Sequence, residues 1–380
     1  MFDYIVVGAG FSGLTIAERV ATQLKKRVLI IEKRNHIGGN CYDSYNEDGI
    51  LIHTYGPRVF HTNDKEVWDY VSQFTEWKVY QHKTLIHIEG QDVPFPININ
   101  SIEKLFSNHV SQSIVNKLVE RYGHGSHVLI TELLTSGDDE LIWLANFVVD
   151  KAYANSIRKQ LDLDISTMPE FMLDKIYINI SRDDRHYSDK YQGIPRHGYN
   201  QLFKHMLNDT NVKVMLNADY NEFISVNAHT KQIKFMGQPF QGKLIYTAKL
   251  DELFDFCYGE LPYRTIDFKF KKYNKEHVQS VATINYPNEY DFTRRTEVKY
   301  LTGQNHPQTV LVEEYHRACF RKDIPYYPIV TNDNVTRHQQ YLDLANSIDN
   351  LITLGNLANF QHLDMSSVVK NSLSLFAEYK

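Results

Sequence analysis

The chain has 380 residues, of which 42% are hydrophobic and 23% are charged, and its formal net charge is −5. This length predicts two or three domains with enough apolar residues to form their cores. The slightly acidic balance argues against nucleic acid and anionic membranes as partners.

The three cysteines, Cys41, Cys257 and Cys319, lie far apart in the sequence. Their spacing argues against a disulfide framework and against a zinc site, and it is typical of the reducing cytoplasm, so we expect no metal. The first strand follows Met1 without the basic region of a signal peptide. No apolar run approaches the roughly 18 residues that span a bilayer, so we expect a cytoplasmic protein without membrane insertion.

The N-terminal forty residues predict a βαβ unit. A short apolar strand at 3–7 precedes the segment GAGFSG at 8–13, a helix follows from 14 to about 23, and a second strand at 27–31 ends at Glu32. The segments 77–97 and 263–330 alternate apolar and polar residues and predict strands, including 278–286 and 309–315. Helical spacing dominates from about 100 to 174, and further helices are expected from 200 and from 366. Other strands are expected at 212–216, 233–236, 243–247 and 352–354.

The glycine-rich segment between the first strand and the first helix predicts a dinucleotide site. Gly8 permits the tight turn, Gly10 lets the backbone approach a pyrophosphate, and Gly13 allows the helix to pack closely on the strand. The N–H groups at the start of the helix are donors for phosphate oxygens. Glu32 stands where a carboxylate accepts hydrogen bonds from ribose hydroxyls.

A second glycine pair, Gly38-Gly39, follows Glu32 and precedes Asn40. In this respect the chain resembles flavoproteins of the glutathione-reductase-like group, in which the chain passes close to the FAD diphosphate. This resemblance favours FAD over NAD as the cofactor. The cofactor-binding residues expected in this region are Gly8, Gly10, Phe11, Ser12, Gly13, Glu32, Lys33, Gly39 and Asn40.

Segments distributed over the whole chain resemble the bacterial UDP-galactopyranose mutases. The first, HTYGPRVFHT at 53–62, is similar to the YGPHxFHT segment of that family. The others follow in the family's order and lie at 191–199, 263–267, 292–297, 314–319, 323–328 and 363–365. The ordered set is more specific than any one of its members.

The resemblance implies an α/β fold in three parts. A Rossmann-like FAD-binding domain would comprise 1–75, 199–250 and 335–380. An inserted helical domain for substrate binding and dimerisation would comprise 98–190, and a twisted antiparallel β-sheet domain would comprise 76–97 and 251–334. It also implies a homodimer.

Members of this family interconvert the pyranose and furanose forms of a nucleotide-linked galactose, which supplies furanose for cell-surface polysaccharide. The resemblance implies that the N5 atom of reduced FAD acts as a nucleophile on the anomeric carbon, with no net redox change. It implies an external reductant, either NAD(P)H or a flavin reductase. The protein would clamp the diphosphate, hold the sugar and exclude water.

By position in the family's motifs, Arg294 matches the arginine that clamps the diphosphate, because its fork fits phosphate oxygens. Tyr153 and Tyr315 match tyrosines that donate hydrogen bonds to the same diphosphate. Asp364 matches an acid near the sugar, and His61 matches a histidine that packs by the flavin ring. The other cofactor-binding positions implied are Tyr55, Gly56, Gly355 and Met365.

The sequence departs from the family mainly where ligands bind. The family's KQWG element, with its tryptophan, has no counterpart in residues 153–161, and Lys175 stands in place of an arginine, which loses the bidentate fork. His186 and His362 replace phosphate-binding tyrosines, although Tyr187 is adjacent to the first, and His82 replaces an asparagine near the sugar. Two further exchanges are Arg58, for the histidine of YGPH, and Asn356, for the arginine of a GRLG element.

These departures leave two interpretations. One is a mutase for a different sugar or nucleotide, such as a deoxy or N-acetylated hexose or a thymidine carrier, with UDP-galactose still among the possible substrates. In it, His82, His186 and His362 bind phosphate or sugar hydroxyls. The other is a flavoprotein whose reaction is lost or changed. The first is favoured by the presence of four family residues, Arg294, Tyr153, Tyr315 and Asp364.

Two functions from other classes share the N-terminal fingerprint. One is an FAD-dependent amine oxidase or desaturase, which would bleach its flavin with substrate and produce peroxide. The other is a non-catalytic flavoprotein in a polysaccharide-assembly complex. Isomerisation of a nucleotide sugar by the reduced protein in the absence of oxygen distinguishes the mutase from both.

Overall fold

The structure is a computed structural model that describes residues 2–167 and 173–378. Its contacts divide the chain into two compact units, each discontinuous in sequence. Unit 1 comprises Met1–Val79, Asp189–Thr265 and Ala318–Lys380, and unit 2 comprises Tyr80–Ser188 and Ile266–Arg317. The three-domain division expected from the sequence stays a prediction.

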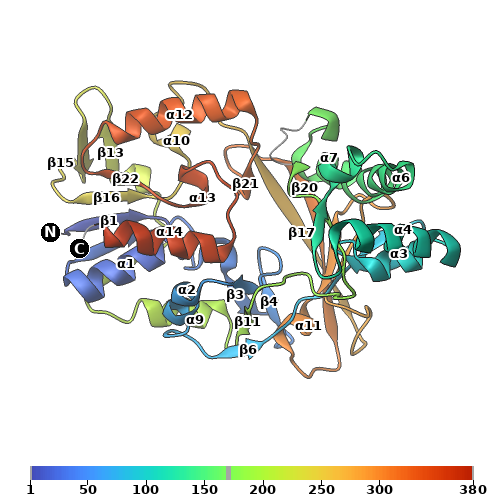
Figure 1. The fold of residues 1–380 in the computed structure, drawn as a ribbon. Coiled ribbons are helices and arrows are strands. Elements are labelled where there is room, and N and C mark those ends of the chain that lie inside the picture. The colour runs from blue at the N-terminus through green and yellow to red at the C-terminus, as the bar shows by residue number, and fades with distance from the viewer. Residues whose placement is uncertain (1, 168–172, 379–380) are drawn as a thin grey trace. The chain divides into compact units, whose positions relative to one another are not determined.

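Unit 1 is built on a parallel sheet of five strands (Figure 1). Adjacent pairs in the order β12-β2-β1-β16-β22 all run parallel. All residues of β1 and β2 are buried, as expected for parallel strands covered on both faces. The strands are β12 (Val212–Met215), β2 (Val28–Ile31), β1 (Tyr4–Val7), β16 (Lys243–Tyr246) and β22 (Leu351–Thr353).

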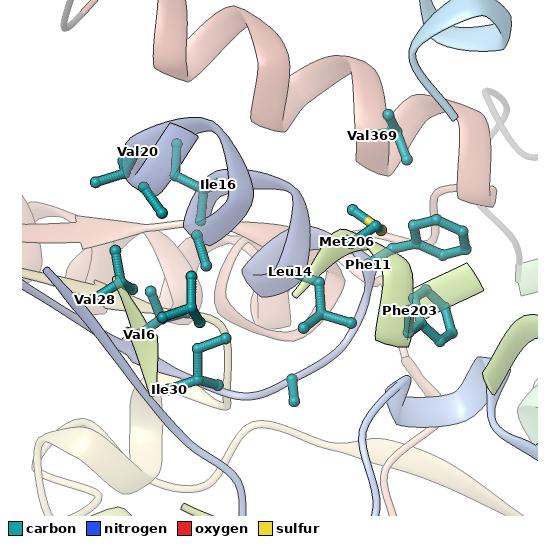
Figure 2. Close-up of a cluster of buried hydrophobic side chains, with 14 of the residues drawn as sticks. Val6, Phe11, Leu14, Ile16, Val20, Val28, Ile30, Phe203, Met206 and Val369 are labelled. Carbon is teal, nitrogen blue, oxygen red and sulfur yellow. The ribbon is translucent and has the colours of Figure 1, made fainter. Parts of the chain in front are cut away.

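Helices cover both faces of this sheet. On one face, Val6 and Ile30 pack against apolar side chains of α1, α9 and α14, including Leu14, Phe203 and Val369 (Figure 2). On the other face, α10 and α12 and a small antiparallel sheet, β13-β14-β15, enclose a second core. The helices that cover the sheet are α1 (Phe11–Leu24), α2 (Lys65–Val71), α9 (Tyr199–Met206), α10 (Leu250–Leu253), α12 (Asn332–Asn346) and α14 (Met365–Ala377), and the small strands are β13 (Ile224–Asn227), β14 (Gln232–Phe235) and β15 (Gln238–Pro239).

Two further small sheets complete unit 1. The hairpin β3-β4 pairs Asp43 with His53, and the sheet β5-β11-β6 pairs His61 with Gln192. These elements are β3 (Asp43–Tyr45), β4 (Leu51–His53), β5 (Phe60–Thr62), β6 (Trp77–Val79) and β11 (Tyr191–Pro195), together with the short helix α13 (Gly355–Ala358) and β21 (Tyr327–Pro328). β21 pairs with Tyr263 and Arg264, the first residues of β17.

Unit 2 contains a sheet in the order β17-β20-β19-β18-β7-β8 and a group of helices. Ile86 and Val93 of the sheet share a core with Leu118 and Leu144 of the helices. The strands are β7 (Thr84–Ile88), β8 (Gln91–Phe95), β17 (Tyr263–Tyr273), β18 (Thr283–Asn285), β19 (Arg294–Glu297) and β20 (Thr309–Ala318), with a separate pair β9 (His127–Leu129) and β10 (Tyr177–Asn179). The helices are α3 (Ile99–Leu105), α4 (Asn108–Tyr122), α5 (Ile130–Leu134), α6 (Asp139–Val148), α7 (Asn155–Leu161) and α11 (Val298–Thr302).

The strand expected at 278–286 is shorter than predicted, because only Thr283–Asn285 pairs with neighbouring strands. Upstream, the backbone N–H groups of Val278 and Gln279 donate to the buried carboxylate of Glu297, at 3.1 and 2.8 Å. A side chain thus takes the hydrogen bonds that a sheet ladder would have supplied. Within residues 2–167 and 173–378, no helix is long and apolar enough to cross a membrane.

Candidate active site

The turn between β1 and α1 leaves room for a ligand at the start of α1. Gly8 has φ +98°, and a Cβ there would lie 2.3 Å from Oγ1 of Thr247. A Cβ on Gly13 would lie 2.1 Å from the carbonyl oxygen of Gly8, whereas one on Gly10 would meet no atom within 4 Å. Gly10 is also the N-cap, without a side chain to accept from the first turn of α1. The turn is therefore tightly packed at Gly8 and Gly13 and open at Gly10. The unsatisfied N–H groups at the start of α1 suit a diphosphate.

Glu32 lies at the end of β2, buried, beside this turn. Its Oε2 accepts the N–H of Ala9 at 2.8 Å, and its Oε1 accepts the N–H of Arg34 at 2.9 Å. Each carboxylate oxygen has two lone pairs, so both can accept a further hydrogen bond. The arrangement holds the carboxylate where a ribose diol can bind it. The neighbouring Lys33 is exposed.

Two other glycine positions approach the same turn. Gly39 has φ +55°, and a Cβ there would lie 3.1 Å from the Cα of Gly10. Gly355 has φ +90°, and a Cβ there would lie 2.6 Å from Oγ of Ser12. The positive φ and the close approach of another atom, from the backbone at Gly39 and from a side chain at Gly355, are the reasons for glycine at both positions. The structure therefore brings the predicted residues of 8–13, 38–40 and 355 together in unit 1.

Asn40 and Tyr55 belong to a polar cluster that begins two residues after Glu32. Arg34 donates to Oδ1 of Asn40 at 2.8 Å, and its guanidinium lies 4.6 Å from the ring centre of Tyr55. The hydroxyl of Tyr55 lies 2.7 Å from Nε2 of His36. Nη1 of Arg34 is buried and has no hydrogen-bond partner among the described residues. An unpaired buried N–H is costly, so it marks a position where a bound ligand can supply an acceptor. Gly56, with φ +87°, follows Tyr55 directly.

The predicted C-terminal cofactor positions lie at the start of α14. Asp364 is the N-cap, and its Oδ1 accepts the N–H of Ser367 at 2.7 Å. Met365 packs against the core formed by α1 and α9. Ser366 donates to Oγ1 of Thr62 at 2.6 Å and so ties α14 to β5, the strand that carries His61. The imidazole Nδ1 of His61 lies 2.9 Å from Oδ2 of Asp189.

In unit 2, three of the predicted ligand-binding residues gather around Phe95. The N–H of His186 donates to the carbonyl of His82 at 2.7 Å, and the two imidazole rings lie 5.5 Å apart. The ring of Phe95 lies 5.7 Å from that of Tyr153 and 6.1 Å from that of His186. Tyr153 lies on a π-helical turn, Val149–Ala154, a rare conformation that occurs frequently at functional sites. Burial raises the pKa of the Tyr153 phenol, so its hydroxyl stays a proton donor.

The orientation of His186 follows from Thr84. The Thr84 hydroxyl donates to the carbonyl of Phe95 at 2.6 Å and lies 2.8 Å from Nδ1 of His186. A hydroxyl has one hydrogen, so Thr84 accepts from His186, and Nδ1 of that histidine carries a proton. The neutral ring then presents Nε2 as an acceptor.

Arg294 and Tyr315 lie on opposite faces of the unit 2 sheet. Arg294 pairs with Glu314 across β19 and β20, and its Nε lies 3.1 Å from Oε2 of that residue. Because side chains alternate along a strand, Tyr315 lies on the other face, where its hydroxyl donates to Glu313 at 3.0 Å. The same alternation and the strand registers place Arg294 on the face of Thr84. Arg294 therefore shares a face with the cluster around Phe95, and Tyr315 does not.

Comparison with known proteins gives the family. Residues 151–362 match the family model described as UDP-galactopyranose mutase, and residues 6–74 match that of an NAD(P)-binding Rossmann-like domain. The chain is 32% identical over 382 residues to UDP-galactopyranose mutase from Mycoplasma pneumoniae, covering 98% of this chain and 95% of that protein. The chain belongs to the UDP-galactopyranose mutase family.

Other relatives and solved structures agree with this membership. The dTDP-fucopyranose mutase from Escherichia coli is 30% identical over 376 residues, 98% of this chain and 97% of that protein. A structure of reduced UDP-galactopyranose mutase has a TM-score of 0.75 at 14% identity, covering 100% and 94% of the two chains, which shows the fold. Putrescine oxidase shares the fold more distantly, with a TM-score of 0.57 at 12% identity over 100% of this chain and 98% of that one. The Rossmann-like domain is of the dinucleotide-binding kind.

His362 is one of the positions where the chain departs from the UDP-galactopyranose mutase pattern. The sequence did not indicate its partner, Tyr327. The ring of His362 stacks on that of Tyr327, with centroids 5.1 Å apart and planes 16° apart. Tyr327 lies in the family segment 323–328, to which the sequence analysis gave no role. The resemblance of segment 323–328 to the family was the one sign in the sequence that Tyr327 could have a role. Lys175 is exposed and lies two residues before β10.

Asn356 is another departure, and its surroundings are polar. Its Nδ2 donates to the carbonyl of Leu363 at 2.9 Å, while its Oδ1 is buried without a partner among the described residues. It follows Gly355, which approaches Ser12 of the fingerprint.

Arg58, the remaining departure, donates its backbone N–H to Nδ1 of His53 at 3.0 Å.

Proposed function

We propose that this chain interconverts the pyranose and furanose forms of a hexose linked to a nucleoside diphosphate, with FAD as its cofactor. The observation that carries the proposal is the likeness to mutases over 98% of the chain, together with an intact dinucleotide cradle in unit 1. The cradle alone would leave the reaction open, because a fold does not specify a chemistry. The likeness extends to the segments that contain Tyr153, Arg294 and His362.

The residues of unit 1 fit FAD. The start of α1 and the open space at Gly10 suit the diphosphate, and Glu32 has acceptor capacity for the ribose diol. The buried unpaired atoms of Arg34 and Asn356 are a donor and an acceptor for further polar groups of the cofactor. When bound and reduced, FAD supplies the nucleophile for the anomeric carbon.

The chain's own residues then bind and orient the substrate. Arg294 offers a guanidinium fixed by Glu314 to the diphosphate, whose negative charge increases when it leaves the sugar. Tyr153 donates a hydroxyl hydrogen bond, and the Nδ1–H tautomer of His186 makes its Nε2 an acceptor for a sugar hydroxyl. His82, His362 and Asp364 complete the proposed ligand-binding set, and His61 is proposed to lie beside the flavin. Tyr315 is not part of this set, because it lies on the sheet face opposite Arg294. Binding of the whole nucleotide sugar holds the reacting carbon in place and limits access of water.

The likeness to the two kinds of mutase is similar, at 32% and 30% identity, so the proposal covers UDP-linked and dTDP-linked hexoses. The replacement of family residues by His82, His186 and His362 supports a substrate other than unmodified UDP-galactose. The proposed enzyme takes electrons from NAD(P)H or a flavin reductase and acts as a homodimer.

The test uses purified holoenzyme reduced with dithionite in the absence of oxygen. It is incubated with a panel of UDP-, dTDP-, GDP- and CDP-hexoses, and pyranose and furanose forms are separated by chromatography. We expect isomerisation of at least one UDP- or dTDP-hexose by the reduced protein and none by the oxidised protein. Absence of isomerisation across the panel would contradict the proposal.

An amine oxidase is the alternative with a specific observation behind it. The chain is 32% identical over 97 residues, 25% of its length, to flavin-containing amine oxidase A from Bos taurus. This match is confined to a quarter of the chain, whereas the mutases match nearly all of it. Flavin bleaching and peroxide release with amines, without nucleotide-sugar turnover, would favour the oxidase.

A further inference from the structure

His61 and Asp189 form a pair whose geometry is fixed from several directions. His61 lies on β5 and Asp189 lies two residues before β11, the strand paired with β5. The side chain of Gln192 donates to the carbonyl of Asp189 at 2.8 Å, and the N–H of Lys190 donates to Oδ1 of Asn63 at 2.8 Å. Both bonds hold the peptide group that joins Asp189 to Lys190. The 2.9 Å contact between Asp189 Oδ2 and His61 Nδ1 therefore lies in a part of unit 1 whose backbone is held by hydrogen bonds.

The strand that carries His61 is also fixed on its other face. Phe60 is fully buried and lies 6.2 Å from the ring of Phe11 in the fingerprint, and Thr62 accepts from Ser366 of α14. Because side chains alternate along a strand, His61 points to the face opposite these contacts. The strand is therefore anchored to the two helices whose N-termini belong to the proposed cofactor site.

The chemistry of the pair decides which imidazole nitrogen carries the proton. An ionised carboxylate only accepts hydrogen bonds, so Nδ1 of His61 is the donor. A neutral imidazole has one N–H, and Nε2 must then be an acceptor. A carboxylate on Nδ1 is a common means of fixing both tautomer and ring orientation.

We infer that Asp189 is a positioning residue, which holds His61 in the Nδ1–H tautomer so that Nε2 acts as a hydrogen-bond acceptor toward the bound cofactor or sugar. This inference rests on the proposed function for the place of His61 beside the flavin. The contact that fixes the tautomer lies within the protein and is the same whichever sugar is bound.

The first measurement reads the tautomer directly. The protein is labelled with ¹⁵N-histidine, and the long-range ¹H–¹⁵N pattern of His61 is assigned by comparison with His61→Gln. We expect the Nδ1–H pattern in the wild type and its loss in Asp189→Ala. An Nε2–H pattern in the wild type, or an unchanged pattern in the variant, overturns the inference.

The second measurement uses the reduced holoenzyme. We expect Asp189→Asn to lower kcat by roughly tenfold, as loss of an orienting partner does, with KM for the nucleotide sugar changed less than twofold. The visible circular dichroism of the bound flavin should change in the same variant. In a His61→Gln background, Asp189→Asn should have no further effect on kcat, because the two residues act as one unit. Equal losses in both backgrounds would show that Asp189 does not act through His61.

A matched control exists in unit 2, where Nδ1 of His87 lies 2.7 Å from Oδ1 of Asp92. Asp92→Asn removes the same kind of pair and should leave kcat and the flavin spectrum unchanged. If Asp189→Asn does not fold, Asp189→Ser serves for both measurements. A wild type that isomerises none of the sugars refutes the proposed function alone, since the tautomer and the flavin spectrum still report on Asp189.

Discussion

The cofactor cradle of unit 1 and the ligand-facing cluster of unit 2 are specified in different ways. The cradle depends on glycines at 8, 13, 39 and 355, where a Cβ would meet another atom within 3.1 Å. That atom belongs to the backbone for Gly13 and Gly39 and to a side chain for Gly8 and Gly355. The predicted ligand-binding residues of unit 2 are side chains from segments far apart in sequence. His82, Tyr153 and His186 form the cluster around Phe95, and Arg294 shares its sheet face. A position without room for a Cβ accepts only glycine, whereas one hydrogen-bonding side chain can be exchanged for another. If these proposed assignments hold, the difference explains how a chain can keep a cofactor site while its ligand-binding residues diverge.

The largest effect is expected from Gly13→Ala in the cradle. Its Cβ would lie 2.1 Å from the carbonyl oxygen of Gly8, and neither backbone can move without disturbing β1 or α1. We expect loss of about 1–3 kcal/mol in the free energy of unfolding and no flavin in the purified protein. The measurements are thermal unfolding of the apoprotein and absorbance near 450 nm.

Gly10→Ala is the matched variant, since a Cβ there meets nothing within 4 Å and the φ of −80° suits alanine. It should leave the stability of the apoprotein nearly unchanged and still weaken flavin binding, because the methyl group enters the space proposed for the diphosphate. Equal stability losses in the two variants would contradict this distinction.

In unit 2, Arg294→Ala should lower kcat/KM at least about a hundredfold, roughly 3 kcal/mol of transition-state stabilisation. The flavin content should not change, because Arg294 belongs to the proposed diphosphate clamp and not to the cradle. Steady-state kinetics with the best nucleotide sugar measures the effect. Arg317→Ala, which breaks an exposed ion pair with Asp267 in the same sheet, is the control and should cost less than twofold. Near-normal activity of Arg294→Ala would contradict the proposal that Arg294 binds the diphosphate.

The hairpin β3-β4 of unit 1 predicts a dependence of stability on pH. Burial, with a further contribution from the Arg58 charge, lowers the pKa of His53 to about 3. Between about pH 3 and pH 6.5 the unfolded chain binds a proton here that the folded chain does not, so the stability that His53 contributes falls as the pH falls below 6.5. Buried Asp43, whose pKa is raised to about 6, contributes in the opposite direction, so the effect of His53 is read by comparison with a variant. At pH 5 the loss from His53 should be about 2 kcal/mol relative to pH 7.

His53→Asn should reduce that loss, because an amide oxygen replaces Nδ1 as acceptor for the N–H of Arg58 without a titrating ring. Urea unfolding of both proteins at pH 5, 6 and 7 measures the difference. His229→Asn, at an exposed position in the same unit, should behave as the wild type. If the wild type and His53→Asn lose stability in parallel, burial of His53 is not the cause.

The sequence could predict the turn and the acid of the cradle because these two elements are local, whereas Gly355 was expected only from the family resemblance. The turn at Gly8–Gly13 and the acid at Glu32 lie within one βαβ unit, and their spacing in the sequence predicts how that unit folds. It could not predict that Tyr315 lies on the sheet face opposite Arg294, because this depends on the register of two strands. Nor could it find the partners Thr84, Asp189 and Tyr327, whose contacts are made between segments distant along the chain. The strand expected at 278–286 was too long for a similar reason, since Glu297 captures part of its backbone.

The smallest effect tests whether such distant contacts support the cluster in unit 2. Nδ2 of Asn155, in the first turn of α7, donates to Oδ1 of Asn288 at 2.9 Å, and Nδ2 of Asn288 donates to the carbonyl of Lys151 at 3.0 Å. These bonds join the π-helical turn of Tyr153 to the loop that leads into β19 and Arg294. Asn288→Ala removes both bonds and should cost about 1 kcal/mol of stability. KM for the nucleotide sugar should rise a few-fold with flavin affinity unchanged.

The control for this variant is Asn274→Ala, which removes an exposed hydrogen bond to Gln308 in the same unit. It leaves the segment of Tyr153 and the loop before Arg294 in place, so KM should stay at the wild-type value. A rise in KM for Asn288→Ala alone would show that a contact between two distant segments sets the ligand-facing residues. A loss of flavin in the same variant would contradict the contrast between the two units, because the cradle should not depend on this contact.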